Sequence, residues 1–162
     1  MQLPRTSLAL TSFLAALALT IPTAYAADIP GTSGDDVLHG TRGDDTIRGG
    51  AGNDVIDGRR GHDVLDGGSG DDRLSDYKGV GSGDPIDTTR DVFRGGPGRD
   101  TLSVGHNDVV HAGPGADQVW AYYVGEGDLI DCGAGADVLH LHEDLHGLET
   151  RGCETILTEY AG

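Results

Sequence analysis

Acidic residues recur at a fixed interval in the first half of the chain, and their spacing suits the binding of a cation. Five nine-residue units follow one another without a break from Gly31 to Ser75. Each unit has glycine at its first and fourth positions, aspartate at its sixth and an aliphatic residue at its eighth. Glycine turns with positive φ expose backbone carbonyl oxygens, and aspartate adds charged oxygens beside them. Because calcium takes roughly six to eight oxygen ligands, the turns are predicted to bind Ca2+.

The pattern continues beyond residue 75 when it is followed through its aspartate and aliphatic residues rather than its glycines. Six further Asp-x-aliphatic triplets bring the total to eleven units. Each unit is typical of a turn followed by a very short strand, and such strands bury their aliphatic residue only by stacking on one another. We expect one narrow core made of Leu38, Ile47, Ile56, Leu65, Leu74, Phe93, Leu102, Val110, Val119, Ile130 and Leu139.

The nonapeptide GGxGxDxUx resembles the repeat of the repeats-in-toxin (RTX) family, and the resemblance covers residues 31–139. It implies an all-β fold, namely a right-handed parallel β-roll in which two nonapeptides form one full coil. It also implies that calcium ions lie between successive turns on the same edge of the roll. In that family the ligands are backbone carbonyl oxygens and the sixth-position aspartates.

Two units per coil would place alternate turns on opposite edges of the roll, so that regular and irregular turns separate. The turns that begin at residues 31, 49, 67, 95, 112 and 132 are all well formed and belong to one edge. On the other edge only the turns at 40 and 58 keep the glycine pattern. The predicted calcium ligands are Asp36, Asp54, Asp72, Asp100, Asp117 and Asp137 on the first edge, with Asp45 and Asp63 on the second.

The irregular edge is where contact with a protein or glycan partner would be expected. It includes the long segment 76–90 and, by the same counting of units, Trp120, Tyr122 and Tyr123. Loops vary more than the elements they connect, so ordinary loop variation is the alternative explanation for this edge.

The two ends of the chain are predicted to differ from the repeats. An apolar run from Leu8 to Ile21 precedes Ala24-Tyr25-Ala26, which is the order of a cleavable secretory signal peptide. A membrane anchor is the alternative, but the run is shorter than the ~20 residues that a spanning helix needs. The two cysteines, Cys132 and Cys153, are predicted to form a disulfide. The expected organisation is a signal peptide (1–26), a calcium-binding β-roll (27–140) and a disulfide-stapled C-terminal cap (141–162) of a secreted, extracellular protein.

The composition limits the partners. The chain has 27 acidic and 11 basic residues and a formal net charge of −16. Nucleic acid is excluded as a partner because phosphate binding needs clustered Lys and Arg, which are scattered here. Calcium ions are the expected partners, together at most with an unidentified extracellular or cell-surface molecule.

Two histidine patterns could indicate other metals. The sequence His142-Glu143-Asp144-Leu145-His146 matches HExxH, but zinc peptidase chemistry also needs a helix, a third ligand and a cleft, and no histidine follows His146. His140 and His142 would share one face of a strand, where a transition metal could bind, with solvated surface as the alternative.

Three classes of function follow from these patterns, and no enzymatic activity is predicted. The first is a calcium-binding module that folds when it binds the ion. The second is an adhesive or cell-envelope scaffold that calcium rigidifies. A zinc-dependent hydrolase is the third and most distant class.

Overall fold

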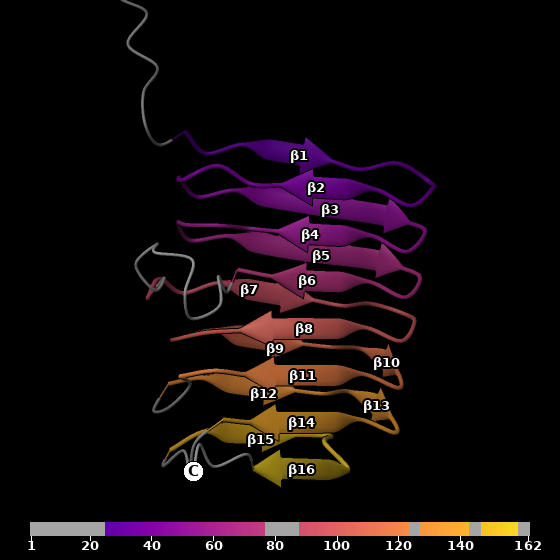
Figure 1. The fold of residues 1–162 in the computed structure, drawn as a ribbon, viewed down its shortest axis with the longest axis vertical. Helices are drawn as coiled ribbons and strands as arrows, with labels where there is room; N and C mark the ends of the chain where they lie inside the picture. Colours follow the sequence, from indigo (N-terminus) through magenta and orange to yellow (C-terminus); the bar gives the residue numbers. More distant parts are fainter. Residues whose placement is uncertain (1–24, 77–87, 124–126, 143–146, 159–162) are drawn as a thin grey trace, which may run out of the picture.

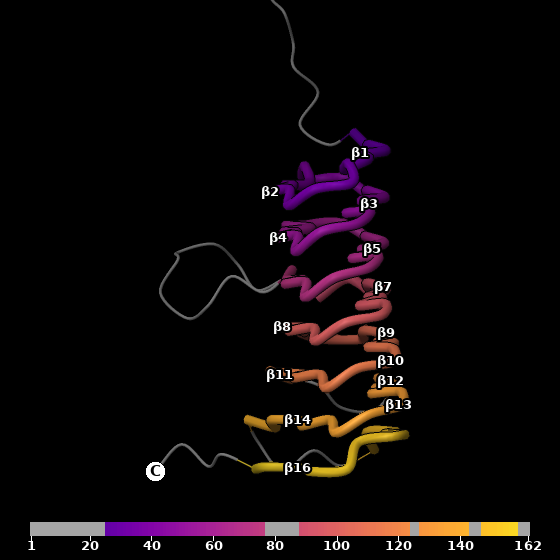
Figure 2. Tube along the Cα trace, turned by 90° about the vertical axis from the view of Figure 1, so that its right-hand side faces the viewer, coloured from indigo at the N-terminus to yellow at the C-terminus, as the bar shows by residue number. Residues whose placement is uncertain are grey.

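The chain forms two parallel β-sheets that face each other across a narrow core (Figure 1). The structure is a computed structural model and describes residues 25–76, 88–123, 127–142 and 147–158. Within these ranges the elements are strands joined by turns, with no helix, and therefore no helix that could cross a membrane. Figure 2 shows the coils stacked from β1 and β2 at one end to β16 at the other.

Each of the two large sheets contains seven strands. The first sheet consists of β1 (Asp28–Pro30), β3 (Thr46–Ala51), β5 (Val64–Ser69), β7 (Val92–Arg94), β9 (Val109–His111), β12 (Leu129–Asp131) and β15 (Glu149–Arg151). The second consists of β2 (Val37–His39), β4 (Val55–Asp57), β6 (Arg73–Ser75), β8 (Thr101–Val104), β11 (Gln118–Ala121), β14 (Val138–Leu141) and β16 (Thr155–Thr158). A small third sheet pairs β10 (Pro114–Gly115) with β13 (Ala134–Gly135).

The register confirms that two nonapeptides make one coil. Val37 of β2 pairs with Val55 of β4, which pairs with Arg73 of β6, so each step within a sheet advances by two units. The alternate units form the other sheet, where Ile47 pairs with Leu65. The chain is thus a parallel β-solenoid, as the nine-residue period predicted.

The core confirms the predicted eighth-position residues. Ten of the eleven are almost completely buried, and Leu38, near the end of the stack, is partly buried and packs against them. The later strands of the second sheet are one residue longer, so Val104, Ala121 and Leu141 also point inward. Strand alternation places these residues on the same face as the core residue two positions earlier.

Both ends of the solenoid contain strands that lie outside the eleven units. β1 pairs with β3, and Asp28 of β1 forms an ion pair with Arg48. At the other end β15 and β16 add one more pair of strands to the two sheets. The residues described between 149 and 158 therefore continue the coil, and the exact boundary of a C-terminal cap stays a prediction.

The predicted disulfide between Cys132 and Cys153 is confirmed. The two Cα atoms lie 5.1 Å apart, within the usual range for such a bond. Cys132 is fully buried beside the core, and Cys153 precedes β16. The bond therefore ties the last pair of strands to the coil before it, and a loop of this length contributes about 3 kcal/mol in the chain-entropy model.

Candidate metal centre

The six regular turns all lie on one edge of the solenoid, on the right in Figure 1. They precede β2, β4, β6, β8, β11 and β14, which are neighbours in the second sheet. The turns that precede strands of the first sheet lie on the opposite edge, where the segment 77–87 falls outside the described residues. The separation of regular from irregular turns is therefore a property of the fold.

The aspartates of the regular edge form a continuous ladder of hydrogen bonds. The backbone N–H of Asp36 donates to Oδ1 of Asp54 at 2.8 Å, and the N–H of Asp54 donates to Oδ1 of Asp72 at 2.8 Å. The same bond links Asp72 to Asp100, Asp100 to Asp117 and Asp117 to Asp137 at 2.8–2.9 Å. Each carboxylate is thereby fixed against the turn of the preceding coil, one coil away.

The ladder ends on a residue that the sequence pattern did not include. The N–H of Asp137 donates to Oε2 of Glu154 at 2.8 Å, so Glu154 occupies the position of the next aspartate. Glu154 was not predicted from the sequence because the terminal coil has no glycine turn and no Asp-x-aliphatic triplet.

The second carboxylate oxygen is the part of each aspartate that is suited to bind a cation. Oδ2 of five ladder residues is fully buried and has no hydrogen-bond partner; these are Asp54, Asp72, Asp100, Asp117 and Asp137. A buried oxygen of this kind costs free energy unless a donor or a cation satisfies it. Five such atoms, one per coil, fit a row of cations between the turns.

The first glycine of the repeat makes room for this oxygen. A Cβ atom placed on Gly95 would lie 2.5 Å from Oδ2 of Asp100, and Cβ atoms on Gly49 and Gly67 would meet Oδ2 of their own aspartates in the same way. A side chain at Gly49, Gly67 or Gly95 would therefore crowd the carboxylate, although Ala112 and Cys132 hold the same position in the units of Asp117 and Asp137.

The second glycine aligns backbone carbonyl groups along the same edge. Gly50, Gly68, Gly96, Gly113 and Gly133 have φ between +94° and +116°, a region that favours glycine. A Cβ on Gly113 would lie 2.5 Å from the carbonyl oxygen of Gly96, so these oxygens face the turn of the next coil. Carbonyl and carboxylate oxygens together are the ligands that Ca2+ prefers.

Electrostatics favour a cation at this edge. Burial, with a smaller contribution from the neighbouring carboxylates, raises the pKa of Asp100 to about 7 and that of Asp117 to about 6. Burial also raises the pKa of Asp72 and of Asp137. Stacked carboxylates without a counter-ion therefore resist ionisation, and a divalent cation would remove this penalty.

The first coil differs in how its carboxylates are satisfied. Oδ2 of Asp36 accepts hydrogen bonds from both N–H and Oγ1 of Thr32, at 2.6 and 2.8 Å. Oδ2 of Asp45 accepts one from the N–H of Thr41 at 2.5 Å. These two predicted ligands already have partners within their own turns, where threonine stands in place of the second glycine.

The second edge has its own ladder of hydrogen-bonded aspartates, and it extends further than the sequence predicted. The N–H of Asp45 donates to Oδ1 of Asp63 at 2.8 Å, as the two regular units led us to expect. The N–H of Asp63 then donates to Asp91, and that of Asp91 to Asp108, at 2.7 and 3.0 Å. Loss of the glycine turns at these units therefore did not remove the aspartate ladder.

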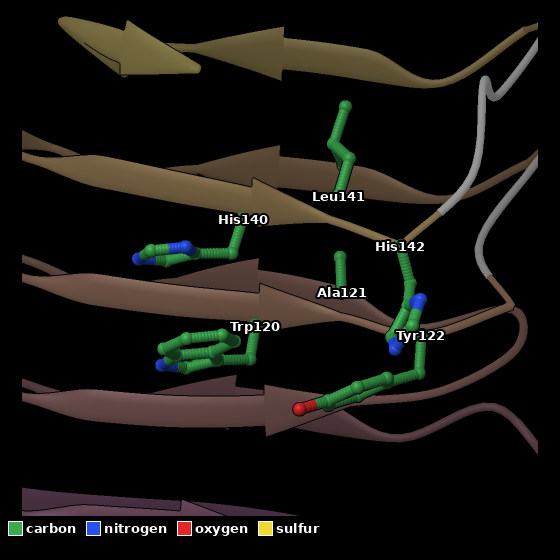
Figure 3. A pocket seen from close by; sticks show the side chains of 6 residues that line it. All are labelled: Trp120, Ala121, Tyr122, His140, Leu141 and His142. Carbon is green, nitrogen blue, oxygen red and sulfur yellow. The ribbon is translucent and has the colours of Figure 1, made fainter. Parts of the chain in front are cut away.

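The structure corrects the position of Trp120. The residue lies within β11, on the outer face of the second sheet, and not on the irregular edge (Figure 3). Its indole stacks on the imidazole of His140 with centroids 3.8 Å apart and planes at 3°. The prediction was wrong because Trp120 is the ninth residue of its unit, which lies in the strand just as Asp57 and Ser75 do in earlier coils.

His140 and His142 do share one face, as their alternation predicted (Figure 3). Each ring lies against an aromatic ring of the preceding coil, Trp120 for His140 and Tyr122 for His142. Neither histidine belongs to a metal-ligating cluster in the part of the chain that the structure describes. In the HExxH match, His142 directly follows strand β14, while residues 143–146 lie outside the described ranges.

The fold and its turns define a class of protein, a parallel β-solenoid whose coils are joined by acidic glycine turns. A family model for the RTX calcium-binding nonapeptide repeat matches in four copies, over residues 30–65, 54–75 and 87–119. The chain therefore contains repeats of the RTX calcium-binding nonapeptide family. Comparison with curated proteins and with solved structures gave no match.

Proposed function

We propose that this protein is an extracellular calcium-binding module whose folding is coupled to Ca2+ binding in the turns of the regular edge. The observation that carries the proposal is the row of five buried Oδ2 atoms that have no hydrogen-bond partner, at Asp54, Asp72, Asp100, Asp117 and Asp137. Asp36, Asp45 and Asp63 are proposed as additional ligands at the first coils.

Coupling between folding and binding follows from the charge and the core. The described core is one residue wide in each early strand, so it supplies little hydrophobic stabilisation per coil. Neighbouring carboxylates about 4.8 Å apart repel by roughly 1 kcal/mol even at the dielectric constant of water. The free energy of calcium binding then becomes free energy of folding.

Location outside the cell is part of the proposal. Extracellular calcium modules bind the ion with dissociation constants on the order of 10⁻⁴–10⁻³ M. The Cys132–Cys153 disulfide suits an oxidising compartment, and the order of residues 1–26 suits a signal peptide that is removed on export. The chain would remain unfolded where calcium is scarce and fold after export, with residues 27–140 as the β-roll.

We propose a binding role and not a catalytic one. A scaffold role, in which calcium rigidifies a surface for adhesion or for the cell envelope, is the second candidate. It is favoured by the outward-facing row of Trp120, Tyr122, His140 and His142, since Trp and Tyr are enriched at interfaces. Zinc-dependent hydrolysis through the HExxH match is not proposed.

A calcium titration of the protein that begins at Ala27 tests the main proposal. Circular dichroism in chelator should show little β structure, and Ca2+ should restore it cooperatively at 10⁻⁴–10⁻³ M, an order-of-magnitude range. Mg2+ is the control, because its smaller octahedral shell fits carbonyl turns poorly. A full β spectrum in chelator, unchanged by calcium, would refute the coupling.

A further inference from the structure

Asp76 occupies a buried position where the equivalent residue of every other described coil except the last is glycine or aliphatic. It directly follows β6, and strand alternation turns Leu74 inward, Ser75 outward and Asp76 inward. Asp76 lies one residue beyond the paired residues of β6. At this position the early coils have the first glycine of the next unit, and the later strands have their additional inward-facing residue. The equivalent residues are Gly40, Gly58, Val104, Ala121 and Leu141, with the exposed Thr158 in the last coil.

The carboxylate of Asp76 is buried and only partly satisfied. The residue is 4% exposed, and its Oδ1 is fully buried without a hydrogen-bond partner. In the regular units the space beside the first glycine holds Oδ2 of the unit's own aspartate, as for Gly58 and Asp63. At this unit a second carboxylate has entered the space that the glycine would have left.

Three carboxylates meet at this point. Oxygens of Asp76, Asp91 and Asp108 all lie within 4.8 Å of one another, and all three residues are buried. Asp108 is held in place by the N–H of Asp91 on Oδ1, at 3.0 Å, and by the N–H of Gly105 on Oδ2, at 2.8 Å. The cluster is therefore preorganised by backbone hydrogen bonds from two successive turns.

The spacing of the three carboxylates suits one calcium ion. Calcium binds oxygen at about 2.3–2.6 Å, so two ligands on opposite sides of one ion are roughly 4.6–5.2 Å apart. The three carboxylate oxygens all lie within 4.8 Å of one another, so they are close enough to ligate one ion. Without a cation, burial and the adjoining carboxylates raise the pKa of Asp76 well above its usual value and that of Asp108 to about 8.

We propose that Asp76, Asp91 and Asp108 bind one Ca2+ ion in a site built differently from the repeat turns. Three carboxylates replace the ligands that glycine carbonyls supply elsewhere, which explains how these turns can lose their glycines. Asp76 directly follows β6, Asp91 directly precedes β7 and Asp108 directly precedes β9. The ion would tie together the two sides of the insertion 77–87 and the following coil, so that the solenoid resumes in register.

Counting bound ions tests the site. Native mass spectrometry at saturating calcium should show one ion fewer in Asp76→Asn than in the unmodified protein. Asp76→Val is the second variant, because valine already fills the equivalent position at Val104, which is completely buried. Both variants should fold in calcium and both should lack the same single ion. Asp57→Asn, an outward-facing position on β4, is the control and should bind the full number.

The outcomes separate this site from the turn sites. If the two Asp76 variants bind as many ions as the unmodified protein, the cluster is a proton-sharing group of carboxyls and the proposal is wrong. If the unmodified protein bound a single ion that both variants lost, the cluster site would stand and the turn sites would fail. If either variant lost every ion, the cluster would not be a site separate from the turn sites, and the proposal would be wrong.

Discussion

Each ladder aspartate uses its two carboxylate oxygens for different purposes. Oδ1 accepts a backbone hydrogen bond from the neighbouring coil, whereas Oδ2 of Asp54, Asp72, Asp100, Asp117 and Asp137 is left for a cation. The first is a structural contact, and the second is the proposed ligand of a cation. Substitution by asparagine separates the two, because the amide keeps one acceptor oxygen and loses the charge.

Asp72→Asn should raise the calcium midpoint for folding without abolishing the fold. Asp72 lies in the middle of the regular edge and adjoins the cation positions on both sides of its turn. Loss of its charge should raise the midpoint on the order of tenfold, equivalent to ~1.4 kcal/mol of binding free energy. The midpoint is read from circular dichroism during a calcium titration.

Asp57→Asn is the matched control for that measurement. Asp57 lies on β4 of the same sheet, faces outward and is close to His39. The substitution removes the same charge from the molecule but no turn ligand. Equal shifts for the two variants would mean that general charge, not ligation at the turns, sets the calcium midpoint.

Sequence reasoning found the residues of the regular edge and missed Asp76. The sixth-position aspartates repeat at a fixed offset from two glycines, so each is identified by its own unit. Asp76 does not lie at a fixed distance from two glycines, and in the sequence it resembles the first residue of a loop. Its inward direction follows only from the pairing of β6 with β8, which a single sequence does not reveal.

At the scale of the turn, the fourth glycine matters wherever another coil lies beside it. Gly70 has φ of +133°, and a Cβ on it would overlap the carbonyl oxygen of Gly52 in the preceding turn. Gly34 holds the same position in the first unit, but a Cβ there would meet nothing within 4 Å. The fourth glycine of the repeat is therefore constrained by a neighbouring coil at Gly70 but not at Gly34.

Gly70→Ala should destabilise the calcium-bound protein, whereas Gly34→Ala should not. A non-glycine residue at positive φ costs about 1–3 kcal/mol, to which the overlap with Gly52 adds. Gly34→Ala should change stability by no more than ~0.5 kcal/mol. Urea unfolding at saturating calcium measures both, and equal losses would contradict the stacking of Gly70 on Gly52.

The strands were predictable where the nonapeptide governs them and less so elsewhere. The triplets predict the strands from β2 to β14 other than β10 and β13, because each triplet turns one apolar residue toward the core. β1, β15 and β16 contain no triplet and form because they continue the pairing of an existing sheet edge. The extra residue of β8, β11 and β14 likewise depends on neighbouring strands.

At the scale of the whole molecule, stability depends on how many carboxylates must ionise together. The formal net charge is −16, and the ladder places much of that charge inside the coils. Stacked repeats have stabilities set by each coil and its neighbours. Protons and calcium ions should therefore compete to neutralise the same edge.

Acidification should stabilise the calcium-free fold. Burial raises the pKa of Asp100 from 3.8 to about 7 and that of Asp117 from 3.8 to about 6. The folded state then binds more protons than the unfolded state between these values, so folding is favoured below pH ~4 and loses that contribution as pH rises to ~7.

Circular dichroism in chelator, recorded from about pH 4.5 to about pH 8, checks the direction of this pH dependence. The β signal at ~pH 4.5 should exceed that at ~pH 8, and the calcium requirement should rise as the pH falls, because protons occupy the ligands. A calcium-free β signal that increased toward pH 8 would show that the carboxylates are not buried together.

The stack of Trp120 on His140 gives the molecule a built-in optical reporter. The chain has one tryptophan, and its indole lies against the next coil at the joint between β11 and β14. Indole fluorescence therefore reads the assembly of the last coils alone, while circular dichroism averages over all of them. Coincidence of the two signals during calcium addition would mean that the solenoid forms in one step, and a lag between them would give the direction in which it grows.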